Sequence, residues 1–103
     1  MTEIDDKFFE RADEHIHLSN KQLAKVTMGK VSASMMYSVA RFNAWVSATG
    51  WNSQKEMEEA KEETLEYFVE EYKKMLKENL EDYINNFDNY MNKNNSSGNS
   101  TNA

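Results

Sequence analysis

Two histidines near the N-terminus come closest, by type and spacing, to a metal-binding motif. His17 follows Glu14 by three positions, the Glu-x-x-His spacing that di-iron helical bundles use. Such a site needs a second pair and two further inward-facing glutamates, and His15 is the only other histidine of the chain. Because both histidines flank the apolar Ile16, we place them at the margin of a helix face. We predict no metal site and no cofactor, with weak Zn²⁺ or Ni²⁺ binding by the two histidines as the alternative.

Other catalytic chemistries find little support. The absence of cysteine excludes thiolate metal sites and cysteine nucleophiles. Three glycines are too few to build a phosphate-binding loop. Four serines of the middle segment lack the glycine-rich turn that exposes a serine nucleophile: Ser32, Ser34, Ser38 and Ser47. We therefore predict no catalytic residue, and a non-enzymatic protein is favoured over an enzyme.

The polar residues of the middle segment are more informative. Asn43 falls between two apolar arcs, where its amide would be partly buried and would need hydrogen-bonding partners. Arg41 shares a side with Tyr37, so it can lie over an aromatic ring or pair with a carboxylate such as Asp13. One interpretation is that these groups fix the register of packed helices. The other is a small polar pocket for an anionic or amide-bearing ligand, formed by Tyr37, Arg41, Asn43 and Asp13.

Two glycines, Gly29 and Gly50, divide the chain into three segments with helical periodicity. The first, about residues 6–26, carries one apolar face: Phe9, Ala12, Ile16, Ser19, Leu23 and Val26. The second, about residues 30–49, carries two. One arc holds Val31, Met35, Val39, Phe42 and Val46, and the other holds Ala33, Met36, Ala40 and Ala44. A helix that is apolar on two sides is packed on two sides, so we expect the second segment to be central.

The third segment is the longest. It begins at Ser53 and Glu56, whose types and spacing form a capping box. An apolar stripe then runs without proline or glycine to Met91, which predicts a helix of about 38 residues and roughly 57 Å. The first two helices reach only about 30 Å each. The other two helices are therefore too short to cover the whole stripe.

Two geometries would cover the surplus stripe. The chain can break near Asn79, which with Asp82 resembles a second helix cap, and fold back as a fourth short helix. Alternatively the helix stays straight and its C-terminal half packs against a second copy of the chain. We favour the straight helix because no loop residues separate the halves. It predicts a homodimer whose contact residues are Leu80, Tyr83, Ile84 and Phe87.

Length and charge set the remaining limits. A chain of 103 residues predicts one domain, residues 1–91, followed by a disordered Asn/Ser-rich tail, residues 92–103. The net charge is −6, and the acids concentrate in residues 51–91, which argues against nucleic-acid binding. No apolar run is long enough to span a membrane, and the N-terminus does not resemble a signal peptide. We expect a soluble, cytoplasmic, acidic protein.

Several stretches are similar to a known family. They are Glu10 to Asp13, Gly29 to Tyr37, Ala40 to Ala44, Glu66 to Phe68, Tyr72 to Leu76 and Glu78 to Tyr83. Across roughly residues 5–91 they resemble a proteobacterial family of short helical proteins, the domain of unknown function 3144. The resemblance implies a bacterial cytoplasmic protein and supplies no activity.

Taken together, the sequence predicts an all-α protein: an antiparallel three-helix bundle with a long third helix. The function it favours is a non-enzymatic interaction or regulatory module that self-associates through that helix and offers its acidic face to another protein. The alternative is a ligand-binding or catalytic protein that uses the polar pocket on the central helix. A third hypothesis is an acidic decoy that occupies a nucleic-acid-binding protein.

Overall fold

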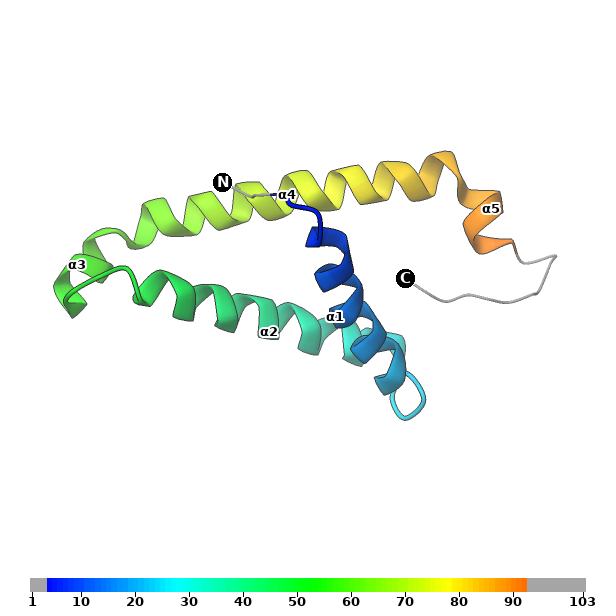
Figure 1. Cartoon of the computed structure of the whole chain (residues 1–103), viewed down its shortest axis with the longest axis horizontal. Coiled ribbons are helices and arrows are strands. Elements are labelled where there is room, and N and C mark those ends of the chain that lie inside the picture. The colour runs from blue at the N-terminus through cyan, green and yellow to red at the C-terminus, as the bar shows by residue number, and fades with distance from the viewer. Residues whose placement is uncertain (1–3, 93–103) are drawn as a thin grey trace.

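Five helices and no strand make up residues 4–92, the part of the chain that the computed structural model describes (Figure 1). They are α1 (Phe8–Gln22), α2 (Met28–Ala48), α3 (Gln54–Glu59), α4 (Lys61–Asn85) and α5 (Phe87–Met91). The all-α prediction is confirmed. The expected polar tail lies outside the described residues except for Asn92.

The N-terminal corner, where α1 packs on the first half of α2, holds the only buried residue between residues 4 and 92. That residue is Val31, which is 5% exposed. The α1 face turned toward α2 repeats every three or four residues and is half-buried: Phe8, Ala12, Ile16 and Ser19. The Ser19 hydroxyl lies 3.4 Å from the Met35 sulfur on α2. Phe8 rather than Phe9 points inward, which shifts the predicted face by one residue at its start.

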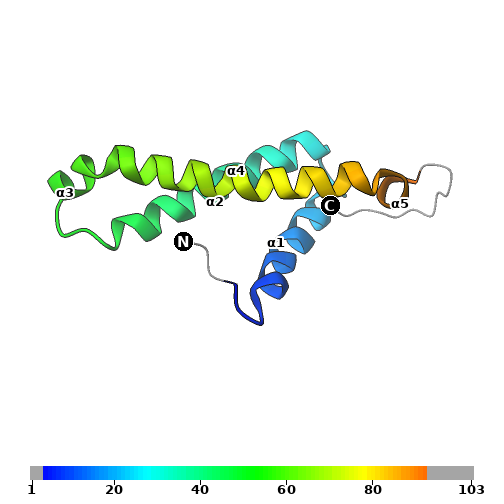
Figure 2. The ribbon, with the colours of Figure 1, turned by 90° about the horizontal axis from the view of Figure 1, so that it is seen from above.

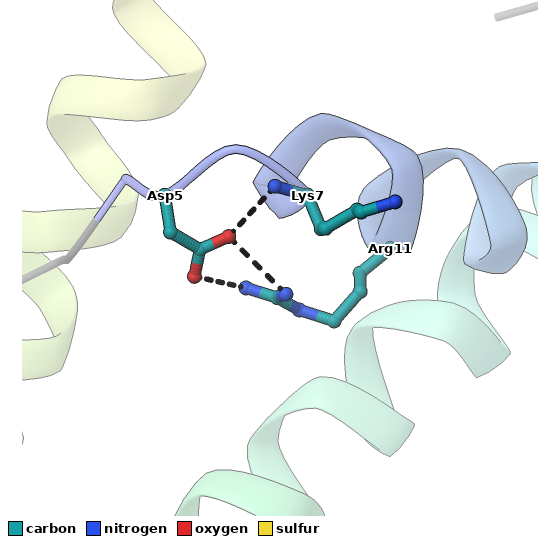
Figure 3. A network of polar contacts seen from close by, with 3 residues as sticks. All are labelled: Asp5, Lys7 and Arg11. Carbon is teal, nitrogen blue, oxygen red and sulfur yellow. Dashed lines mark hydrogen bonds and ion pairs between the residues drawn. The ribbon is translucent and has the colours of Figure 1, made fainter.

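A polar network fixes the start of α1 (Figure 3). The Asp5 carboxylate accepts a hydrogen bond of 2.8 Å from the Lys7 backbone N–H and two from the Arg11 guanidinium, at 3.0 and 3.3 Å. The hydrogen bonds from Arg11 hold the pKa of the Asp5 carboxyl below its ordinary value. This pairing orients the chain before the first helical turn.

The capping box at the start of α3 is present. The Ser53 hydroxyl accepts from the Glu56 N–H at 3.2 Å. The Glu56 carboxylate accepts in return from the backbone N–H of Asn52, one residue before the cap, at 2.8 Å. The third segment therefore starts where the sequence predicted.

The third segment bends at Ala60 and at Asn86, and α4 passes through Asn79 without interruption. The Asn79 side chain caps nothing, because its amide donates to the Met75 carbonyl one turn earlier, at 2.8 Å. At Asn86 the side-chain amide donates to the Asp82 carbonyl and to the Asp82 carboxylate, both at 3.0 Å. The predicted alternative of a break near Asn79 is therefore wrong. The unbroken helix α4 has 25 residues instead of the predicted 38 or so, and it is about 37 Å long.

The helices form an open arrangement rather than a closed bundle. Helices α2 and α4 both extend to the same side of α3, with antiparallel chain directions, and they separate with distance from it (Figure 1). Seen from above, α1 slants so that its own N-terminal end lies farthest from α4 (Figure 2). The radius of gyration is 17.0 Å, against about 13 Å for a compact chain of 100 residues. The antiparallel course of the helices matches the prediction, but α1 does not fill the space between α2 and α4.

Candidate functional site

An exposed apolar stripe runs along α4 in the described chain. Its members share one helix face and are between 42% and 70% exposed: Leu65, Val69, Tyr72, Leu76, Leu80 and Ile84. We call this set the α4 stripe. Within residues 4–92, the substantial packing of α4 is with its chain neighbours α3 and α5. Side chains of this size are ordinarily covered, so the α4 stripe is a candidate interaction surface.

The four residues predicted for self-association lie at the C-terminal end of this surface. Leu80, Ile84 and Phe87 are exposed. Tyr83 is half-buried, because its ring packs against that of Tyr90 on α5 with 4.7 Å between the ring centroids. Helix α5 therefore covers only a small part of the apolar end of α4.

A hydrogen bond holds α5 in this position. The Tyr90 hydroxyl donates to the Asp82 carboxylate at 3.0 Å. The same hydrogen bond, with the negative charge of Asp82, raises the pKa of the Tyr90 phenol above its ordinary value. Asp82 thus accepts from both Asn86 and Tyr90, and it organises the turn that ends α4.

Two hollows lie along α2, near the end where α3 joins it to α4. The first has a volume of about 700 Å³. It is lined by Tyr37, Ser38, Arg41, Phe42, Ala44, Trp45, Ala48 and Met57. The second, of about 710 Å³, opens between α2 and α4. It is lined from α2 by Ala40, Asn43, Ala44 and Ser47, from α3 by Gln54, Met57 and Glu58, and from α4 by Lys61, Thr64, Leu65 and Phe68.

The residues of the predicted polar pocket are divided between these hollows. Tyr37 and Arg41 line the first, whereas Asn43 lines the second and is half-buried there. Asp13 is exposed on α1 and lines neither. The ion pairs formed within the described range are Asp5–Arg11, Lys7–Glu10 and Glu71–Lys74, so Arg41 does not pair with Asp13 there.

The two histidines of α1 are exposed. In the described part of the chain, no three His, Cys, Asp or Glu side chains are grouped so as to hold a metal ion. No helix there is both long and apolar enough to cross a membrane.

An aromatic pair on α2 was missed as part of a surface. The rings of Phe42 and Trp45 lie 5.5 Å apart, and both residues are 61% exposed. Sequence periodicity placed Phe42 on a face that should be covered. Helix length could have predicted this surface, because α1, with 15 residues, cannot cover the whole length of α2, with 21.

Comparison with known proteins identifies the family. The family model described as "Protein of unknown function (DUF3144)" matches residues 8–84. A solved structure, the NMR structure of the protein NB7890A from Shewanella sp., is similar with 39% identity and a TM-score of 0.73. The similarity covers 89% of this chain and 98% of the Shewanella chain. No curated protein matches the sequence. The chain belongs to the DUF3144 family, whose function is unknown.

Proposed function

We propose that this protein is a non-enzymatic interaction module that self-associates through the α4 stripe. The observation that supports it most is the set of large apolar side chains on α4 that no other helix of the described chain covers. Leaving such side chains in water forfeits about 1.5–3 kcal/mol for each one that could be fully buried. A second copy of the same chain could cover these side chains, and it is present wherever the protein is.

The exposed area of the chain supports this proposal. A compact monomer of 12.0 kDa exposes about 6,000 Å². This chain exposes 9055 Å², an excess of roughly 3,000 Å². A stable protein–protein interface takes about 800 Å² from each partner. Even a third of the excess is enough for a homodimer.

The small core points the same way. Isolated helices have marginal stability in water, and most helices in proteins are stabilised by burying an apolar face. Among residues 4–92 only Val31 is buried, and it is still 5% exposed. We therefore propose that folding and association are coupled, so that α4 and the second half of α2 gain their cover from the partner.

Paired substitutions test the proposal. Leu80→Glu with Ile84→Glu places two charges in the C-terminal half of the proposed interface and should convert a dimer to a monomer in sedimentation equilibrium. The matched control is Leu18→Glu, because Leu18 is 56% exposed but lies on α1, away from the α4 stripe. We expect the control to remain a dimer. If the wild type sediments as a monomer at micromolar concentration, the proposal is wrong.

A second function is favoured by one observation. Tyr37 and Arg41 line the same hollow of about 700 Å³, and Arg41 forms no ion pair within residues 4–92. A guanidinium beside a phenol suits an anionic or amide-bearing ligand. Arg41→Met should leave the Tm unchanged and abolish binding of a co-purified anion, as read by native mass spectrometry. Loss of Tm without any bound molecule in the wild type would instead assign Arg41 to packing.

The setting and partners remain part of the proposal. A cysteine-free acidic chain suits the reducing cytoplasm, and its acidic half suits a basic protein partner in addition to its own second copy. A stoichiometric basic protein recovered with the chain from its native host would support this second interaction. Recovery of the homodimer alone would restrict the module to self-association.

A further inference from the structure

We propose that two copies of the chain pair through α4 in antiparallel orientation, about a twofold axis near residues 70 and 71, with the acidic start of each α4 beside the basic middle of the other. The inference rests on the proposed self-association and specifies its geometry. It follows from three features of α4: the spacing of its apolar residues, the placement of its charges and the position of α2.

The spacing of apolar residues sets the register. Leu65, Val69, Tyr72 and Leu76 are separated by four, three and four positions, which is the seam of a coiled coil. Beyond Leu76 the seam continues through Asn79, Tyr83 and Asn86, so two of its next three positions are asparagines. An antiparallel pair centred between residues 70 and 71 sets Leu65 against the partner's Leu76 and Val69 against the partner's Tyr72. This register uses the apolar seam positions and leaves both asparagines outside the central layers.

The charges on one flank of the seam support the same register. Glu62 and Glu66 are followed on this flank by Lys73 and Lys77, all exposed and none in an ion pair within the described chain. Each residue has a like charge four positions away, which is mildly unfavourable within one helix. In the antiparallel pair, the two-fold axis brings the same flanks together, so Glu66 meets the partner's Lys73 and Glu62 meets the partner's Lys77. A parallel pair would set acidic block beside acidic block.

The position of α2 also favours the antiparallel pair. Helix α2 faces the N-terminal half of α4 across the second hollow, which Leu65 and Phe68 help to line. The C-terminal half, with Leu80 and Ile84, has no such neighbour in the described chain. Antiparallel pairing carries this bare half to the α3 end of the other subunit, where Ile84 falls level with the partner's Met57. Met57 lines both hollows, so the apolar end of α4 reaches an apolar recess.

Charge reversal tests the orientation. Glu66→Lys and Lys73→Glu should each weaken the homodimer roughly tenfold at low salt, because the twofold axis repeats every altered contact. At positions 66 and 73 one variant then carries two lysines and the other two glutamates, so a mixture of the two variants should form a heterodimer. The double variant, with both changes in one chain, should regain the wild-type Kd within about twofold. All these differences should shrink in 1 M NaCl.

A matched pair of variants controls for bulk charge. Glu63 and Lys74 lie on the side of α4 away from the seam, so Glu63→Lys and Lys74→Glu make the same charge changes outside the proposed contact. Their mixture should show no preference for the heterodimer. Equal preference in both mixtures, or no recovery in the Glu66→Lys/Lys73→Glu double variant, would overturn the antiparallel register.

A distance measurement gives an independent answer. The sequence has no cysteine, so Asn85→Cys carries a single spin label on the exposed end of α4. Two antiparallel helices centred between residues 70 and 71 place the labelled positions about 40 Å apart, at 1.5 Å per residue. A separation under about 25 Å would mean a parallel pair and would refute this inference while leaving self-association intact. A wild type that sediments as a monomer would refute both.

Discussion

The first half of α2 and the C-terminal half of α4 each carry an apolar face, but only the face on α2 is covered by another helix of the same chain. On α2, Val31 is buried beneath α1, and Met35 beside it is half-buried. On α4, Leu80 and Ile84 are exposed and only α5 packs nearby. The comparison shows that an amphipathic pattern specifies which face needs cover, and that the cover need not come from the same chain.

The largest expected effect comes from removing the covered contact. Val31→Ala deletes two buried carbons from the N-terminal corner and should cost about 2 kcal/mol of the free energy of unfolding. The loss should be the same at every protein concentration, as measured by chemical denaturation, because α1 and α2 belong to one chain.

Ile84→Ala is the matched change on the uncovered side. We expect it to lower stability only at concentrations where the chain is dimeric, and to shift the concentration dependence of the Tm. If both variants lose stability equally at all concentrations, the apolar end of α4 does not gain its cover from a second chain.

The next effect concerns the capping box at the start of α3, which fixes where the third segment begins. Ser53→Ala removes the hydroxyl that accepts from the Glu56 N–H and should cost about 1 kcal/mol. Ser38→Ala, at an exposed position within α2, is the control and should change the free energy of unfolding by less than about 0.5 kcal/mol. Equal losses from the two serines would show that the cap contributes nothing of its own.

A smaller effect is pH-dependent and belongs to the N-terminal corner. Hydrogen bonding by Arg11 lowers the pKa of Asp5 in the folded chain, so this contact stabilises α1 above the ordinary carboxyl pKa near 3.8 and is lost as the pH falls through the folded value. Hydrogen exchange at the Lys7 amide, corrected for its intrinsic rate, should keep its protection down to pH 3.8 and lose it only at lower pH. Asp5→Asn should reduce that protection at neutral pH and make it insensitive to acid.

The smallest effect is spectroscopic and concerns the turn after α4. The Tyr90 phenol should ionise at a higher pH than an ordinary tyrosine, because its hydrogen bond to Asp82 and the charge of that carboxylate both oppose ionisation. The contact that holds α5 is therefore present below pH 10 and is lost as the pH rises through the folded pKa. Asp82→Asn should return the Tyr90 transition, followed by ultraviolet absorbance, to the ordinary range. An unchanged transition would show that Asp82 does not hold Tyr90.

The parts of the fold that depend on local chemistry could be predicted from the sequence. The helical periodicity of the three segments predicted an all-α chain, and the capping box located the start of the third segment. The end of α4 could not be predicted in this way. It depends on Asn86 and Tyr90 meeting Asp82, a contact that exists only after the chain has turned.

The candidate polar pocket shows a different limit. Arg41 and Asn43 are two positions apart, so they point about 200° apart on a helix, and they line different hollows. Periodicity alone contains this information. Periodicity does not show how far along α2 the helix α1 extends. Helix α1 packs on Met35 but leaves Phe42 exposed farther along the same face.

Sedimentation equilibrium of the unmodified chain tests the central claim most directly. Self-association through the α4 stripe predicts twice the mass of one chain at micromolar concentration, with dissociation on dilution. A single species of 12.0 kDa from micromolar concentration upward would contradict it.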